Sequence, residues 1–175
     1  MKNMLRMTLA ASVAALTLAS TPANAAAVGA TTPATATAKI VKPLTLTATG
    51  TLDFATILIP AAGVTATRTI SLSNGNVRDC AGGSAEVVCS GTTSVPTYTV
   101  VGTNKMVVNV IKTASSLAGS NGGTLAFRPT GPASVTLPNS GNGGTPFNIG
   151  GDIDIVPTTV DGTYTGNIDV TVDYP

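Results

Sequence analysis

The chain has 175 residues, only 10% of them charged, and a formal net charge of +1 at pH 7. It contains neither His nor Trp, which excludes Ser-His-Asp and Cys-His nucleophile arrangements and zinc or iron sites built on His. Thr, Gly and Pro are abundant instead, and this composition favours short β-strands and turns over helices.

Residues 1–25 have the form of a secretory signal peptide. Lys2 and Arg6 supply two positive charges, residues 7–19 form an apolar run, and residues 23–25 (Ala-Asn-Ala) fit a small-x-small cleavage site. The apolar run is shorter than the roughly 20 residues that a membrane-spanning helix needs, so we expect no membrane span after cleavage. Cleavage leaves seven basic residues against eight acidic ones, a net charge of −1, and no basic stripe that would attract nucleic acid. The sequence therefore predicts a secreted protein.

The mature chain begins with a segment that has little to pack, and we predict a flexible N-terminal arm over residues 26–33. A period of two follows: Ala34, Ala36, Ala38 and Ile40 alternate with Thr35, Thr37 and Lys39. This alternation predicts a first strand, which Pro43 either interrupts or places at a sheet edge. We assign residues 34–175 to a single β-sandwich domain.

Further segments of the same alternating type follow as far as the C-terminus, and no stretch after residue 25 keeps a helical period. The run Thr97–Ile111 is predicted to be a hairpin that turns at residues 102–105, and residues 113–123 are predicted to be a polar loop. Roughly eight to ten short strands at this spacing predict an all-β fold, an antiparallel immunoglobulin-like β-sandwich. The other predicted strands are 44–49, 51–58, 67–73, 124–127, 134–137, 147–156 and 162–174.

The last of these segments is the most regular. Its even positions carry Tyr164, Ile168, Val170, Val172 and Tyr174, and its odd positions carry Thr, Asn and Asp. Side chains along a strand point alternately to opposite faces, so we predict one long strand with a core face and a solvated face. We expect the even face of this strand to lie in the core and its backbone edge to be the functional surface.

Cys80 and Cys89 are the only cysteines, and both follow the signal segment. In an oxidising compartment such a pair is expected to form one disulfide that closes the Gly-rich loop between them. A redox or metal role is not favoured, because the spacing is not C-x-x-C and no His completes a site.

The remaining chemistry rests on carboxylates. Asp152 and Asp154 share one face of a predicted strand, opposite Ile153 and Ile155, and such a pair could serve a glycosidase or a Ca²⁺ site. The interpretation we favour is the solvated face of an amphipathic strand. We accordingly predict no catalytic residue, no metal site and no cofactor.

Two segments resemble a known family. ATATAKIVKPLTLTATGTLDF, residues 34–54, resembles the opening of the secreted bacterial family called domain of unknown function 4402. GGDIDI at 150–155 and DGTYTGNIDVTVDYP at 161–175 resemble its ending, although Ala55 stands where that family usually has Gly after Phe54. The ending is also similar to that of spore-coat-U-type and other chaperone–usher pilin subunits.

The pilin likeness implies a sandwich completed by the N-terminal strand of a neighbouring subunit, with a periplasmic chaperone as a transient partner. On this basis we expect an exported, non-enzymatic structural protein, a fimbria-like or cell-surface filament subunit that assembles with itself by β-strand addition. The candidate donor residues are Ala34, Ala36, Ala38 and Ile40. The location would be the periplasm, surface or exterior of a Gram-negative-type bacterium. The alternative is a soluble, monomeric secreted module that binds a surface glycan or protein.

Overall fold

The computed structural model describes residues 27–29, 31–138 and 143–175, so the predicted signal peptide lies outside the described residues. The chain divides into two units, Met1–Ala38 and Lys39–Pro175. Every strand in the described residues belongs to the second unit, which is an antiparallel β-sandwich as predicted. Among the described residues, no helix has the length and apolar character needed to cross a bilayer.

The N-terminal alternation does not form a strand. Residues 33–44 carry no strand assignment, and the side chains of Ala34, Ala36 and Ala38 are exposed, as is that of Ile40 at 89%. The prediction of a strand here is therefore wrong for the single chain. Most of the apolar side chains in the pattern are methyl groups, and their burial releases too little free energy to offset the entropy of ordering the backbone.

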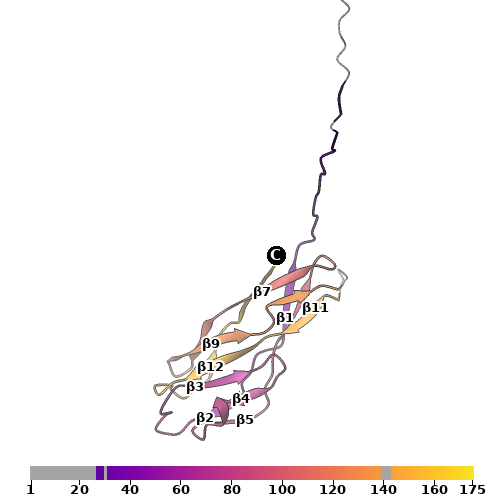
Figure 1. The fold of residues 1–175 in the computed structure, drawn as a ribbon. Coiled ribbons are helices and arrows are strands. Elements are labelled where there is room, and N and C mark those ends of the chain that lie inside the picture. The colour runs from indigo at the N-terminus through magenta and orange to yellow at the C-terminus, as the bar shows by residue number, and fades with distance from the viewer. Residues whose placement is uncertain (1–26, 30, 139–142) are drawn as a thin grey trace, which may run out of the picture. The chain divides into compact units, whose positions relative to one another are not determined.

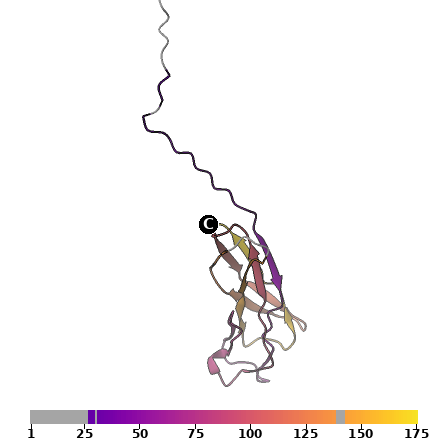
Figure 2. The same cartoon turned by 90° about the vertical axis from the view of Figure 1, so that its right-hand side faces the viewer.

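Two groups of strands make up the two layers (Figure 1 and Figure 2). One layer holds a six-stranded sheet, in the order β13-β8-β9-β12-β3-β4, and a three-stranded sheet, in the order β10-β7-β14. The other layer holds β1-β6-β11 and the pair β2-β5. The first layer comprises β3 (Arg68–Leu72), β4 (Arg78–Cys80), β7 (Val107–Thr113), β8 (Ser115–Gly119), β9 (Thr124–Thr130), β10 (Ser134–Thr136), β12 (Gly150–Ile155), β13 (Tyr164–Thr165) and β14 (Asp169–Asp173). The second comprises β1 (Thr45–Thr49), β2 (Thr56–Leu58), β5 (Val88–Ser90), β6 (Thr97–Val101) and β11 (Thr145–Asn148), and a single 3₁₀ turn, η1 (Ala81–Gly83), lies between β4 and β5.

The core consists of two clusters between the layers. One gathers Phe54, Ile70, Phe127, Ile153 and their neighbours, and the other gathers Tyr98, Val108, Leu137, Ile149 and theirs. β2, β4 and β5 lie together at one end of the sandwich, called here the β2 end, and β7 and β11 lie toward the other end (Figure 1).

Two expected local structures differ from the prediction because the chain changes layer. β6 pairs with β1 and β11, whereas β7 pairs with β10 and β14, so the predicted hairpin is an arch between the layers. The predicted strand 147–156 likewise divides at Ile149, because β11 and β12 belong to different sheets. An alternation with a period of two shows which side chains of a strand face the core. It does not show whether the next strand pairs with that strand in the same sheet or lies in the opposite layer, because both arrangements give the same pattern.

The closing segment is also divided. β13 pairs with β8 and β14 with β7, and between these ladders residues 166–168 lie opposite residues 114–117. The alternation nevertheless runs through the break. The even positions Tyr164, Ile168, Val170, Val172 and Tyr174 are half-buried against the two core clusters, and the odd positions are exposed.

Candidate functional site

A cleft of about 690 Å³, with an apolar floor, opens between the first and last parts of the sandwich. One wall comes from residues 48–59 and the other from residues 159–168. Its floor consists of core side chains, among them Phe127, which is only 1% exposed. The floor residues are Leu117, Leu125, Phe127, Ile153 and Ile155.

The first wall owes its shape to a bulge between β1 and β2. Two residues, 54 and 55, oppose three, 91–93, between the pairs Asp53–Ser94 and Thr56–Ser90. The Asp53 carboxylate accepts a hydrogen bond from the Ala55 backbone N–H at 2.8 Å, and Ala55 has a φ of 59°. The bend at Ala55 changes which positions of the chain face the core. Phe54, an even-numbered residue, points inward before the bend, and Ile57, an odd-numbered residue, points inward after it.

The second wall is the break between β13 and β14. A Cβ on Gly166 would lie 2.8 Å from Leu117 Cδ2 and 2.9 Å from the Ser116 carbonyl oxygen, so only glycine allows the chain to pass this close to β8. The Ser115 hydroxyl donates a hydrogen bond to the Asn167 carbonyl oxygen at 3.2 Å, and the Tyr164 hydroxyl donates one to the Val160 carbonyl oxygen at 2.6 Å. The first bond ties the wall to β8 of the larger sheet, and the second braces the turn before β13 within the wall itself.

Both walls end in unpaired strand edges. β1 pairs only with β6, and β13 and β14 pair only with β8 and β7, so in the described part of the chain their outer edges have no strand partner. An unpaired edge presents a row of backbone N–H and C=O groups to solvent. The cleft therefore combines apolar side chains on its floor with hydrogen-bonding backbone on both sides, which suits an extended peptide.

The cleft is closed at the end away from β2. There the Tyr174 hydroxyl accepts a hydrogen bond from the Thr103 backbone N–H at 2.7 Å and donates one to the Lys42 carbonyl oxygen at 2.8 Å. Leu44 and Leu46 belong to the same core cluster as Val170 and Val172. The first and last strands thus meet at this end and separate toward the β2 end.

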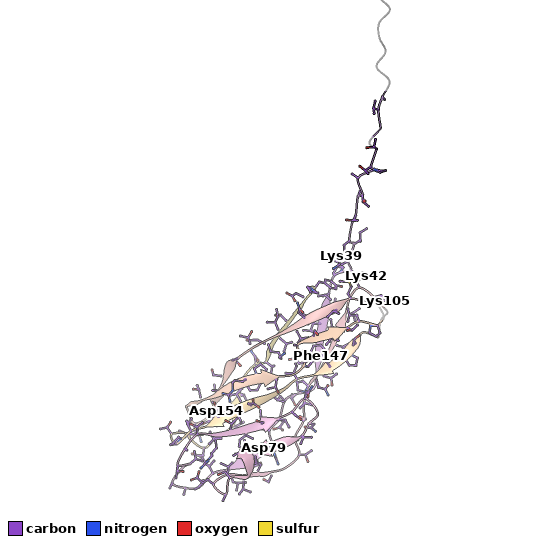
Figure 3. All side chains as sticks on the ribbon, in the orientation of Figure 1. Lys39, Lys42, Asp79, Lys105, Phe147 and Asp154 are labelled. Carbon is purple, nitrogen blue, oxygen red and sulfur yellow. A yellow bond between two sulfur atoms is a disulfide. The ribbon has the colours of Figure 1, made fainter. Side chains whose placement is uncertain are left out.

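Charge plays little part inside the cleft. Among the residues that the structure describes, Asp53 and Asp161 are the only charged ones that line it, and no Lys or Arg does. Lys39, Lys42 and Lys105 lie toward the closed end of the sandwich (Figure 3). The cleft thus offers no positive charge to an anionic ligand such as a phosphate.

The predicted disulfide is confirmed. Cys80 and Cys89 are bonded, with their Cα atoms 6.0 Å apart. Cys80 ends β4 of the larger sheet, and Cys89 is the central residue of β5 in the opposite layer. The bond therefore joins the two layers as well as closing a loop.

One member of the acidic pair, Asp154, forms an ion pair with Arg128. Ile153 and Ile155 are buried, while Asp152 and Asp154 are half-exposed on the other face of β12. The Arg128 guanidinium forms two hydrogen bonds with the Asp154 carboxylate, Thr69 donates a third, and these contacts lower the pKa of Asp154. Among the described residues, no group of three or more potential ligands could hold a metal ion.

The sequence profile of a domain of unknown function, DUF4402, matches residues 44–174. The chain belongs to this family. No curated protein and no solved structure matches it. The DUF4402 match includes both walls and the floor of the cleft, and it begins after the segment 34–40.

Sequence reasoning missed part of the DUF4402 cleft. Leu117 lies in a segment that was expected to be a polar loop, yet it is in β8 and forms part of the floor. The half-buried residues Ser115, Leu117 and Gly119 alternate with exposed residues, as in a strand. This pattern is hard to recognise in the sequence, because only Leu117 among the three is large and apolar. Val160 was missed because it stands alone in the turn before β13.

Proposed function

We propose that this protein is an exported, non-enzymatic structural subunit of a fimbria-like or cell-surface filament, and that it assembles by β-strand addition. The observation that carries the proposal is the apolar cleft between two unpaired strand edges. A sandwich that leaves core side chains such as Ile57 and Ile168 half-covered at its open side gains stability when another strand covers them.

The occupant is the segment Ala34–Ile40 of a second copy. In this segment the side chains of Ala34, Ala36, Ala38 and Ile40 are exposed, and they alternate with polar residues. An added strand would direct these four toward the cleft and leave Thr35, Thr37 and Lys39 in solvent. Small side chains suit this floor, because Leu125, Phe127 and Ile153 are already buried in the single chain.

The similarity of the closing segment to chaperone–usher pilin subunits supports the same function. In those proteins the N-terminal strand of one subunit completes the next, and a periplasmic chaperone holds the unpolymerised subunit. By analogy the partners here are further copies of the chain and a periplasmic chaperone. The signal-peptide pattern at residues 1–25 supports export.

The donor side can be tested without disturbing the fold. In the mature protein, Ala36→Asp places a carboxylate on the face of the added strand that points into the cleft. Thr37→Asp places the same charge on the face that points to solvent. Both positions are exposed in the single chain, so both variants should fold equally well. Electron microscopy and size-exclusion chromatography should show polymers for Thr37→Asp and only monomers for Ala36→Asp.

The acceptor side has a matched pair as well. Val160 lines the cleft and Val107 lies on β7 outside it, and both are 41% exposed. Val160→Asp should abolish polymers, because an unpaired charge in the cleft would have to be desolvated by the incoming strand. Val107→Asp should retain them.

Two results would overturn the proposal. Filaments that survive deletion of residues 26–42 would exclude this donor segment. A mature protein that stays monomeric at every concentration, with and without added peptide, would favour the alternative of a secreted monomeric module that binds a surface glycan or protein.

A further inference from the structure

We propose that the Cys80–Cys89 disulfide and the Arg78 side chain form a clamp that sets the width of the cleft. The inference rests on the proposed function, because it assigns the clamp a role in binding the added strand. It follows from the way in which β2, which forms part of one cleft wall, is connected to the rest of the sandwich.

β2 is anchored through β5. Ile57 of β2 lines the cleft and is paired across the ladder with Cys89, and within the described residues β2 and β5 form a sheet of only two strands. A two-stranded ladder is marginally stable by itself. The position of this wall therefore depends on what holds β5.

The disulfide connects β5 to the cleft floor. Cys80 is paired with Ile70 of β3, Ile70 with Ile153 of β12, and Ile153 with Phe127 of β9. Ile153 and Phe127 are floor residues. A continuous row thus runs from the wall residue Ile57, through the disulfide, to the floor.

The row continues to the opposite wall. Phe127 is paired with Ser115 of β8, whose hydroxyl donates a hydrogen bond to the Asn167 carbonyl oxygen at 3.2 Å. Ile57 and Asn167, which both line the cleft, are therefore the two ends of one belt of paired residues that runs beneath it. The disulfide is the only covalent side-chain link in this belt.

Arg78 adds a second tie at the same place. Its Nη1 atom donates hydrogen bonds to the Phe54 carbonyl oxygen at 2.8 Å and to the Ser90 carbonyl oxygen at 3.1 Å. Arg78 belongs to β4, while Phe54 and Ser90 belong to the cleft wall and to β5. The guanidinium thus ties β5, and the wall segment that leads into β2, to the larger sheet.

The clamp is tested by separating affinity from stability. The receptor is the mature protein with Ala36→Asp, so that its own arm does not compete, and the probe is a fluorescein-labelled peptide of residues 33–42 measured by fluorescence anisotropy. Cys80→Ser combined with Cys89→Ser should weaken peptide binding at least tenfold, and Arg78→Ala should weaken it in the same direction. The matched control is Val108→Ala, which lies in the other core cluster and should lower the melting temperature without changing the dissociation constant.

Amide hydrogen exchange gives a second readout that does not need the peptide. Without the disulfide, exchange at Asp53 and Ser94, whose backbone groups pair with each other, should accelerate relative to β6 and β12. Peptide affinity within twofold of the parent in the double serine variant would overturn the clamp. If the peptide fails to bind the oxidised parent, the proposed function fails. Hydrogen exchange then decides the clamp by itself: faster exchange at Asp53 and Ser94 than in β6 and β12 supports it, and unchanged exchange overturns it.

Discussion

Ala55 holds a backbone conformation that residues other than glycine rarely adopt, with a φ of 59°. The left-handed region costs an L-residue about 1–2 kcal/mol, because its Cβ crowds the following carbonyl oxygen. The family resemblance marks this position as one where glycine is usual, and the bulge in the cleft wall explains why.

Ala55→Gly should therefore stabilise the domain. Relief of the strained conformation exceeds the extra entropy of glycine in the unfolded chain, and we expect a gain of about 0.5–1 kcal/mol in the free energy of unfolding, measured by urea denaturation. Ala126→Gly, in the middle of β9, is the control and should instead lose about 0.5–1 kcal/mol. A loss at both positions would contradict the assignment of strain to Ala55.

The Arg128–Asp154 pair predicts a small acid sensitivity. The hydrogen bond from Arg128 lowers the pKa of Asp154, so its stabilising contribution is present above the unfolded-state pKa of about 4 and is lost as pH falls through the lower folded-state value. Because the Arg128 side chain is 44% exposed, we expect under about 1 kcal/mol.

Thermal unfolding between pH 2 and pH 7 checks this. Asp154→Asn should lower the melting temperature near pH 7 and make a smaller difference near pH 2, because the contribution of the ionised carboxylate declines as pH falls through its lowered pKa. Asp152→Asn removes a carboxylate from the same face without breaking the Arg128 pair, and it should lack this pH-dependent difference. An equal effect of Asp154→Asn at both pH values would show that the ion pair contributes nothing.

At the scale of elements, the last strand is divided but keeps its two faces. Val172 is paired with the buried Val110 of β7, and Thr171 with the exposed Ile111. Val170 is paired with Lys112, whose ammonium group could neutralise a carboxylate placed there. Val172 is therefore the sharper position at which to test the core face.

Val172→Asp should destabilise the domain by several kcal/mol, since it buries an unpaired carboxylate against the second core cluster. Thr171→Asp adds the same charge to the solvated face and should change the free energy of unfolding by less than about 0.5 kcal/mol. Urea denaturation of the two purified variants provides the comparison. Similar losses in both would mean that the alternation does not separate a core face from a solvated one.

For the molecule as a whole, folding and assembly should be separable. All strands that the structure describes lie in the unit Lys39–Pro175, so deletion of residues 26–38 should leave the free energy of unfolding within about 0.5 kcal/mol of the monomeric Ala36→Asp protein. Urea denaturation at matched concentrations measures this. A loss of more than about 2 kcal/mol would mean that the segment stabilises its own domain.

The sequence by itself determined the fold class, the phase of most strands and the disulfide. Alternation in β6, β12 and the closing segment identified their core-facing residues, because the side-chain period of two is a local property of extended backbone. The close pair of cysteines after a predicted export signal led directly to Cys80–Cys89, and the bond is present.

Only the tertiary structure decided which strands pair, and therefore where the cleft lies. The arch at residues 102–106 and the change of layer at Ile149 have the same local pattern as a hairpin and a continuous strand, and the choice depends on contacts between distant segments. The alternating segment Ala34–Ile40 is the clearest case. Its pattern fits a strand, yet a strand forms only where a partner edge and enough burial offset the entropy of ordering, and the single chain gives these small side chains too little to gain.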